Sequence, residues 1–262
     1  MTHQARKRFG QNFLQDKNII YNILAHAGPK SSDHWVEIGP GLGALTRPLL
    51  TSGARLDIVE LDRDLVSYLQ QELANQPQLT IHSDDALKFD FSQLSHGADR
   101  LRIIGNLPYN ISTPLMFHLL ENTACIEDMH FMLQKEVVDK ICATPGSKQY
   151  GRLSVMMQYY CSPEPLFDVP PESFNPIPKV MSAIVKLVPY TQPPVAIKDI
   201  ASFGRLVTQA FGQRRKTIRN SLKELVNEQQ MEVLGIDPNL RAEALSLEQF
   251  AQLSLCLQTD CG

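Results

Sequence analysis

Two short segments contain the residue types from which chemistry is expected. Val36–Gly43 reads Val-Glu-Ile-Gly-Pro-Gly-Leu-Gly, and Gly105–Tyr109, about seventy residues later, reads Gly-Asn-Leu-Pro-Tyr. A glycine-rich turn between a strand and a helix brings bare backbone close to a ligand and aims helix N–H groups at it. The first segment therefore predicts a site for a nucleotide-like ligand, with Gly39 and Gly41 in its turn.

Two acidic residues follow the next strand-like segments of the chain. Glu60 comes 21 residues after Gly39, where an acidic side chain can accept hydrogen bonds from both hydroxyls of a ribose. Asp85 lies just past the third strand-like segment and is placed to accept a hydrogen bond from an adenine amino group. Both residues thus support the nucleotide-like ligand predicted from the glycine turn.

The glycine turn alone does not choose between cofactors. The spacing Gly39-x-Gly41-x-x-Ala44, with Glu60 as the acid for the ribose, also fits the fingerprint of dinucleotide-binding proteins. An NAD-linked oxidoreductase therefore stays open as an alternative on this motif. No Ser/Tyr/Lys or His/Asp constellation for hydride transfer stands out elsewhere to support it.

The segment Asn106–Tyr109 suits the methylation of an aromatic amine. The adenine amino group is a poor nucleophile because its lone pair is delocalised, and acceptors aimed at its two N–H bonds favour the pyramidal, reactive form. We expect the side-chain oxygen of Asn106 and the carbonyl of Leu107 or Pro108 to be these acceptors. Pro108 stiffens the turn, and Tyr109 offers a ring on which the base stacks.

The spacing of apolar residues predicts an α/β fold. Asp16 is the expected N-cap of a first helix. Strands then alternate with helices, which indicates a mostly parallel, doubly wound sheet. Leu166–Val169 and Ala183–Val188 have no clear helix between them and suggest an antiparallel pair at the sheet edge. The other expected strands are Trp35–Ile38, Leu56–Val59, Leu79–His82, Leu101–Ile104 and Met129–Leu133, and the expected helices are Ala44–Leu50, Arg63–Leu73, Pro114–Leu120, Lys135–Ala143 and Arg152–Tyr160.

A change of pattern divides the chain. Pro189–Pro194 holds three prolines in six residues and is a good linker. Beyond it the patterns are only helical: Phe203–Phe211 is amphipathic, and Ser246–Gln249 is a capping box that opens a last helix. We expect a ligand-binding catalytic domain over residues 1–190 and a small all-helical domain over 195–262.

Basic residues cluster locally although the net charge is −3 at pH 7. Six basic residues and no acidic one occur between Gly204 and Lys223, and Arg6–Arg8 is a second acid-free cluster. On one helix, the spacing of Arg215, Arg219 and Lys223 would form a stripe, for which a phosphate backbone is the natural partner. The expected RNA-binding residues are Arg214, Arg215, Lys216, Arg219 and Lys223.

Several properties are expected from what the composition lacks. The five cysteines contain no Cys-x-x-Cys pair and the seven histidines are scattered, so we expect reduced thiols and no metal site. No apolar run approaches the roughly 20 residues that span a bilayer, and the basic N-terminus lacks the apolar core of a signal peptide. The expectation is a cytoplasmic monomer without membrane contact.

Five motifs together make the chain resemble a known family, the ribosomal RNA adenine N6,N6-dimethyltransferases of the KsgA type. The similarity runs nearly end to end. The motifs that carry it are Phe9–Leu14, the glycine turn, Gly105–Tyr109, Phe174–Ala183 and Phe211–Leu222.

The resemblance implies a Rossmann-like class I methyltransferase sheet with a C-terminal helical domain that binds RNA. It implies S-adenosylmethionine as methyl donor. The implied substrate is two adjacent adenosines near the 3′ end of 16S ribosomal RNA in the assembling small subunit, which become N6,N6-dimethyladenosines. Phe174 would be a second ring, opposite Tyr109, around the target adenine. The residues expected around the donor are Asn12, Leu14, Gly39, Gly41, Glu60, Asp85 and Asn106.

Two further alternatives stay open beside this expectation. One is a related methyltransferase that acts on large-subunit RNA, of the type that confers macrolide resistance, although the basic Arg214–Lys216 segment resembles the small-subunit enzymes better. The other is an RNA-binding assembly factor that has kept the fold without turnover. The intact Asn106–Tyr109 turn argues against loss of chemistry.

Overall fold

The computed structural model describes residues 11–95, 100–213 and 215–257. Arg6–Arg8 and Arg214, which belong to the predicted basic clusters, lie outside these residues. The chain forms two compact units, residues 1–138 with 164–189 and residues 139–163 with 190–262. Residues 139–163 thus group with the C-terminal helices and not with the sheet that precedes them. The division of roles between a catalytic and an RNA-binding part stays a prediction.

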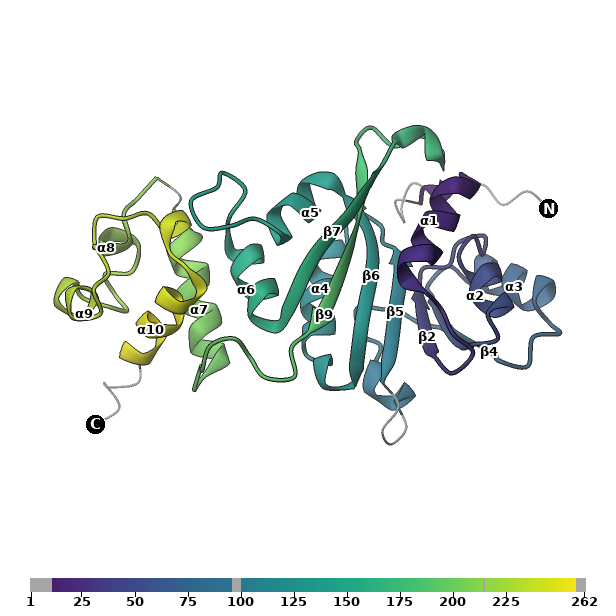
Figure 1. Cartoon of the computed structure of the whole chain (residues 1–262), viewed down its shortest axis with the longest axis horizontal. Coiled ribbons are helices and arrows are strands. Elements are labelled where there is room, and N and C mark those ends of the chain that lie inside the picture. The colour runs from purple at the N-terminus through teal and green to yellow at the C-terminus, as the bar shows by residue number, and fades with distance from the viewer. Residues whose placement is uncertain (1–10, 96–99, 214, 258–262) are drawn as a thin grey trace. The chain divides into compact units, whose positions relative to one another are not determined.

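The first unit is built on a seven-stranded sheet with the order β4-β3-β2-β5-β6-β9-β7 (Figure 1). Five strands run parallel, and β9 lies antiparallel to β6 between it and β7. The predicted parallel sheet with an antiparallel edge is confirmed. The strands are β2 (His34–Ile38), β3 (Arg55–Glu60), β4 (Leu79–Ser83), β5 (Leu101–Asn106), β6 (Ile126–Gln134), β7 (Cys161–Val169) and β9 (Ser182–Pro189).

The central strands are buried on both faces. Every residue of β2 is buried, as is every residue of β5 except Asn106 at its end. Such strands are mostly apolar in sequence because helices cover both sides of a parallel sheet. The helices of this unit are α1 (Lys17–Ala27), α2 (Thr46–Thr51), α3 (Arg63–Glu72), α4 (Ser112–Leu120) and α5 (Lys135–Ile141), the last of which runs past the unit boundary.

Helix α1 begins as the sequence predicts. The Asp16 carboxylate accepts a hydrogen bond from the Asn18 N–H at 2.8 Å, which satisfies one of the free donors of the first turn. The helix ends at Gly28, whose φ of +56° is the left-handed conformation that glycine adopts without strain. Strand β1 (Phe13–Leu14), which precedes α1, pairs with the distant β8 (Phe174–Asn175) in a two-stranded antiparallel sheet.

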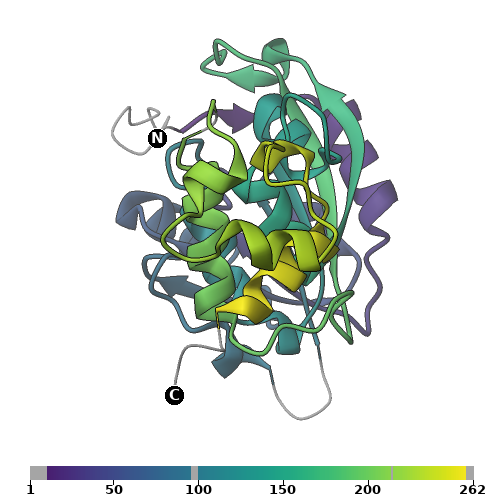
Figure 2. The same cartoon turned by 90° about the vertical axis from the view of Figure 1, so that its left-hand side faces the viewer.

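The second unit is helical (Figure 2). Aromatic rings join its helices: the Tyr159 and Phe203 centroids lie 5.5 Å apart, and those of Phe211 and Phe250 lie 5.6 Å apart. The predicted capping box opens α10, where the Ser246 hydroxyl accepts from the Gln249 N–H. No helix in the described part of the chain is long and apolar enough to cross a membrane. The helices are α6 (Arg152–Tyr160), α7 (Ile200–Phe211), α8 (Ile218–Ser221), α9 (Glu228–Val233) and α10 (Leu247–Cys256).

The prediction of a basic stripe along one helix was wrong. Helix α7 ends at Phe211, and α8 covers only Ile218–Ser221, so Arg215 precedes α8 and Lys223 follows it. Hydrogen bonds to a distant segment replace the helix: the Ile218 N–H donates to the Leu240 carbonyl at 2.8 Å. Sequence spacing alone does not reveal such tertiary pairing.

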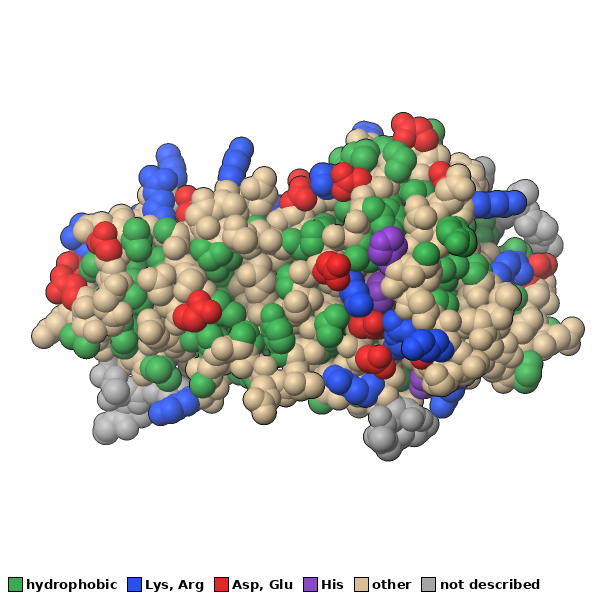
Figure 3. Space-filling view, viewed as in Figure 1, with side chains coloured by type: hydrophobic (Ala, Val, Ile, Leu, Met, Phe, Trp, Pro, Cys, Tyr) green, Lys and Arg blue, Asp and Glu red, His purple; other side chains and the backbone are tan. Residues whose placement is uncertain are grey.

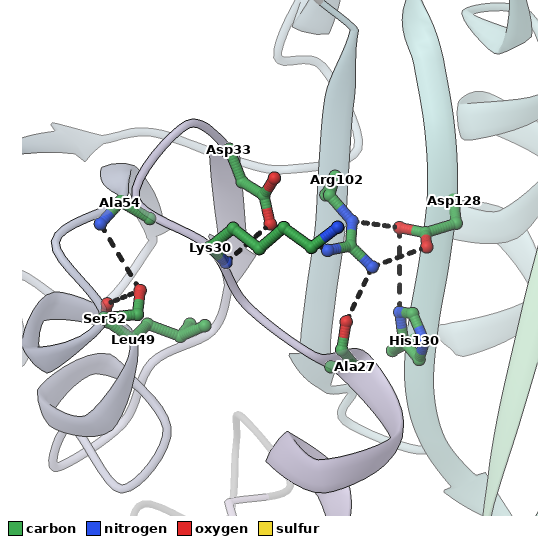
Figure 4. A network of polar contacts seen from close by, with 9 residues as sticks. All are labelled: Ala27, Lys30, Asp33, Leu49, Ser52, Ala54, Arg102, Asp128 and His130. Carbon is green, nitrogen blue, oxygen red and sulfur yellow. Dashed lines mark hydrogen bonds and ion pairs between the residues drawn. The ribbon is translucent and has the colours of Figure 1, made fainter.

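A buried arginine joins four segments at the amino ends of the central strands (Figure 4). Arg102, in β5, donates two hydrogen bonds to Asp128 at 2.9 and 2.7 Å, one to Asp33 at 2.8 Å and one to the Ala27 carbonyl at 2.7 Å. Its guanidinium carbon lies 4.3 Å from the centroid of the Trp35 ring. The Arg102 cluster therefore fixes the end of α1 and the start of β2 against β5 and β6.

Replacing Arg102 by alanine is expected to lower the free energy of unfolding by about 3–5 kcal/mol, because it leaves buried carboxylates without their cation. Chemical denaturation monitored by circular dichroism measures this change. Arg47→Ala is the control, since Arg47 and its partner Glu72 are both about half exposed, with N and O 3.5 Å apart; its cost should stay below about 1 kcal/mol. Equal costs for the two variants would contradict this account.

Candidate active site

A cavity of about 300 Å³ lies at the carboxyl ends of β2, β3, β4 and β5. These four strands lie side by side and run parallel, so the segments that follow them meet at one edge of the sheet. The cavity brings together the residues predicted around donor and base, with the exception of Phe174. Those that line it are Asn12, Leu14, Gly39, Gly41, Glu60, Asp85, Asn106, Leu107, Pro108 and Tyr109.

The glycine turn after β2 depends on the absence of side chains. Gly39 and Gly41 have φ values of +66° and +57°, in the left-handed region. The Gly39 N–H donates to the Val59 carbonyl at 3.0 Å, which fixes the turn against β3. A Cβ at position 41 would lie 2.9 Å from the Phe13 ring. Both glycines are thus required by the path of the backbone along the cavity.

Glu60 lies at the end of β3 and is 7% exposed. Its Oε1 accepts a hydrogen bond from the Asp62 N–H at 2.8 Å. Burial raises the pKa of the Glu60 carboxyl, whereas hydrogen bonds from the backbone of Asp62, Gly41 and Leu61 act to lower it. The carboxyl is held in place by backbone donors from its own loop and from the glycine turn.

Asp85 follows β4 and is more open to solvent than Glu60. Its Oδ1 accepts from the Leu87 N–H at 3.0 Å, and its own N–H donates to the Asp84 carboxylate at 2.7 Å. The local turn therefore orients the Asp85 side chain at the rim of the cavity.

Glu37, inside β2, is a cavity residue that the sequence interpretation missed. It is 2% exposed and accepts a hydrogen bond from the Thr46 hydroxyl at 2.6 Å. Burial raises the pKa of its carboxyl from 4.5 to about 8; the Thr46 hydrogen bond opposes this rise, and the neighbouring Glu60 adds to it. The sequence signal that could have identified it is a lone acidic residue between Val36 and Ile38 in a buried strand.

The charged lining of the cavity has one sign. Its ionisable acids are Glu37, Glu60, Asp84 and Asp85, and no Lys, Arg or His side chain of the described residues lines it. Such a surface attracts cations and repels phosphates. Among the described residues, no group of three or more His, Cys, Asp and Glu is placed to hold a metal ion.

The turn after β5 offers two acceptors. The Asn106 amide donates through Nδ2 to the Asn12 carbonyl at 2.9 Å, which leaves its Oδ1 available as an acceptor. The Pro108 carbonyl already accepts from the N–H groups of Ile111 and Ser112, both at 3.1 Å, at the start of α4. No hydrogen bond within the described residues occupies the Leu107 carbonyl. Of the two carbonyls considered from sequence, the structure therefore favours Leu107.

Neighbours on both sides fix this turn. A Cβ at Gly105 would lie 2.7 Å from the Ile38 carbonyl oxygen, so only glycine allows β5 to approach β2 this closely. At the other end, the Tyr109 hydroxyl and the hydroxyl of the buried Ser182 lie 2.8 Å apart, within hydrogen-bonding distance. The position of the Tyr109 ring is thus set by β9.

Phe174 does not line the cavity. It is 3% exposed and lies in β8 opposite Leu14 of β1. Its ring belongs to a core cluster that also contains Leu14, Val169 and Ile184. The role of Phe174 as a second ring against the base stays a prediction.

The basic residues of the second unit are on its surface. Arg215, Lys216 and Lys223 are exposed. Arg219 forms an exposed ion pair with Glu228, with Nε and Oε1 3.5 Å apart, so part of its charge is compensated. Arg214 lies outside the described residues. Figure 3 shows lysine and arginine side chains that project from this unit.

The fold and this strand-end cavity define a methyltransferase of class I. The model of the ribosomal RNA adenine dimethylase family matches residues 2–259. The chain belongs to this family of methyltransferases, and the resemblance expected from the sequence is confirmed.

Relatives and solved structures agree with this assignment. The Ribosomal RNA small subunit methyltransferase A of Methylococcus capsulatus is 57% identical over 256 residues, which cover 97% of this chain and 98% of that protein. A crystal structure of a dimethyladenosine transferase from Plasmodium falciparum superposes with a TM-score of 0.79 at 26% identity, over 92% of this chain and 95% of that one. The 23S rRNA methyltransferase ErmE gives a TM-score of 0.74 at 25% identity, over 95% and 100%.

The raised pKa of Glu37 predicts a pH dependence of stability. Between pH 4.5 and about 8 the folded protein keeps a proton that the unfolded chain has lost, so the free energy of unfolding falls as the pH rises through this window. The slope contributed by Glu37 is at most about 1.4 kcal/mol per pH unit. Denaturation curves from pH 5 to 8 measure it. Glu37→Gln should be less pH-dependent than the parent protein; an identical slope would show that Glu37 ionises normally.

Proposed function

We propose that the chain transfers methyl groups from S-adenosylmethionine to N6 of two adjacent adenosines near the 3′ end of 16S ribosomal RNA. The substrate is the assembling small subunit in the cytoplasm, and the products are N6,N6-dimethyladenosines. One observation carries the proposal: the free acceptors Asn106 Oδ1 and Leu107 carbonyl stand beside a cavity whose charged groups are all acidic. The high identity to the Methylococcus relative over nearly its whole length supports the small subunit as substrate.

The residues of the cavity fit the proposed donor. S-Adenosylmethionine carries a positive sulfonium and an ammonium group, and it supplies an electrophilic methyl group. The acidic residues of the lining other than Glu37, namely Glu60, Asp84 and Asp85, favour such a ligand. We propose that Glu60 accepts hydrogen bonds from the ribose hydroxyls and Asp85 from the adenine amine; both residues line the cavity. The same lining disfavours the pyrophosphate of NAD, which weighs against the oxidoreductase alternative.

The catalytic work of the chain is orientation. Asn106 Oδ1 and the Leu107 carbonyl oxygen accept hydrogen bonds from the two N–H groups of the target amine. The lone pair of the amine nitrogen is thereby directed at the methyl group. Tyr109, held by Ser182, provides a face for the base. Neither acceptor is a strong base, so the proton leaves after the N–C bond has formed and the nitrogen has become acidic. A monomethylated amine has one N–H, so the second transfer uses only one acceptor.

The other two candidates are less well supported. The similarity to ErmE covers the whole fold, yet at 25% identity it is far below the 57% of the small-subunit relative. An assembly factor without turnover would not need the Asn106 amide to be oriented by the Asn12 carbonyl.

We propose that the enzyme acts as a monomer.

A single assay separates these candidates. The protein is incubated with labelled S-adenosylmethionine and either unmethylated small subunits, naked 16S RNA or large-subunit RNA, and the product is mapped. We expect two dimethylated adenosines in the small subunit. Label in large-subunit RNA would support the ErmE-like alternative. If no substrate is labelled, the assembly factor is the candidate that remains.

Asn106→Ala removes one acceptor of the target amine. Methyl transfer to small subunits should fall by at least about 100-fold, as for other groups that stabilise a transition state by one directed hydrogen bond, while RNA binding persists. Asn22→Ala, at an exposed position of α1, should transfer at the parent rate. Normal transfer by Asn106→Ala would contradict the acceptor role.

Charge reversal of Arg215 and Lys216 tests the proposed RNA contact of the second unit. Each lost phosphate contact should reduce the slope of log affinity against log salt by about 1, so the double change to Glu should weaken binding and reduce the slope by up to about 2. Filter binding at several salt concentrations measures it. The control carries the same charge change at the exposed Lys30 and Arg63 of the first unit. If the two double variants weaken RNA binding equally, Arg215 and Lys216 act only through the net charge of the protein and not through phosphate contacts of their own.

A further inference from the structure

The segment 176–181, here called the apolar loop, exposes three large apolar side chains within six residues. Ile177 is 65% exposed, Val180 42% and Met181 39%. Seven other large apolar side chains are exposed in the described part of the chain, and no other segment of this length holds three of them. In the view of Figures 1 and 3, the apolar loop lies above the upper end of β9, and hydrophobic side chains gather on the surface there. Such a concentration marks an interaction surface.

Both ends of the apolar loop are tied to residues that line the cavity. Before the loop, Phe174 pairs with Leu14 in the small sheet of β1 and β8. After it, Ser182 lies 2.8 Å from the Tyr109 hydroxyl. The loop therefore starts and ends beside the elements that surround the proposed target base.

The apolar loop is also held internally. Pro178 is buried between the exposed neighbours on either side. The Met181 carbonyl accepts a hydrogen bond from the Lys135 N–H at 3.0 Å. Ile177 and Val180 are thus presented on a supported backbone, at little further cost in conformational entropy.

The chemistry of the loop matches an opened base stack. An adenine that enters the cavity must first unstack from its neighbouring bases, and an apolar gap then remains in the base stack of the RNA. Proteins that unstack bases fill such gaps with aliphatic side chains. Lys179, between the apolar tips, is exposed and has no ion-pair partner among the described residues, so it is available for a phosphate.

We propose that the apolar loop is an RNA wedge, in which Ile177 and Val180 enter the base stack beside the target adenosine and hold it open while Lys179 contacts the backbone. This inference rests on the proposed function and adds to it the residues that extrude the base. The occupant of the loop is a base step of the substrate RNA.

The test uses the full-length protein and small subunits in which 2-aminopurine, an adenine analogue that fluoresces when unstacked, replaces one target adenosine. Ile177→Ser with Val180→Ser removes the wedge and should abolish the rise in fluorescence on binding. With unmodified subunits, kcat/KM for methyl transfer should fall by at least about tenfold, the scale of an unstacking cost left uncompensated. Equilibrium dialysis of S-adenosylmethionine should show unchanged affinity.

Two variants serve as controls. Ile177→Leu with Val180→Leu keeps the apolar volume and should retain both signals. Val233→Ser removes a side chain that is 81% exposed in α9 and should leave them unchanged.

Parent-like fluorescence and transfer in the serine variant would overturn the wedge. Reduced transfer with a full fluorescence rise would also overturn it, since the loop would then contact something other than the stack, such as a protein of the subunit. The absence of methyl transfer by the parent protein would refute the proposed function instead, and the fluorescence signal would still report on the wedge.

Discussion

The direct pairing of β2 with β5 is the constraint on which the site depends. The sheet order places these strands side by side although two other strands separate them in sequence. They are the point at which the chain reverses its direction across the sheet, where open α/β folds form their crevices. Gly105 permits the approach, because any side chain there would meet the Ile38 carbonyl. The glycine turn and the Asn106 turn consequently leave the sheet as neighbours, and both line the cavity.

Buried ionisable side chains have different partners along the strands of the sheet. At the amino ends, Arg102 is bonded to Asp128; further along, in the middle of β3, Asp57 lies between His34 and His82 with oxygen–nitrogen distances of 2.7 and 2.6 Å. At the carboxyl ends, Glu37 and Glu60 are buried without a basic partner among the described residues. Compensated charge stabilises the fold at one edge. The buried acids at the other edge lack such a partner within the described ranges, so burial raises their pKa values, and a cationic ligand in the cavity would favour their ionised form.

Local signals in the sequence predicted most of the first unit. Strand ends, the Asp16 cap and the residues around the cavity follow from turn chemistry and apolar runs, which act over a few residues. Tertiary contacts decided the rest. The pairing of Ile218 with Leu240 interrupts the expected basic helix, and the packing of Phe174 on Leu14 places its ring in the core. Glu37 was missed because a single acid in a buried strand has no spacing pattern.

The acidic lining also has a consequence for turnover. Once the methyl group has left, the sulfonium of the donor becomes a neutral thioether, and the spent molecule has one positive charge fewer. With the proposed donor in this cavity, the lining acids Glu60, Asp84 and Asp85 would therefore hold the product less strongly than the donor, by an electrostatic difference that needs no movement of the protein. An enzyme that must methylate each amine twice gains from this asymmetry, since exchange of spent for fresh donor is favoured by charge alone.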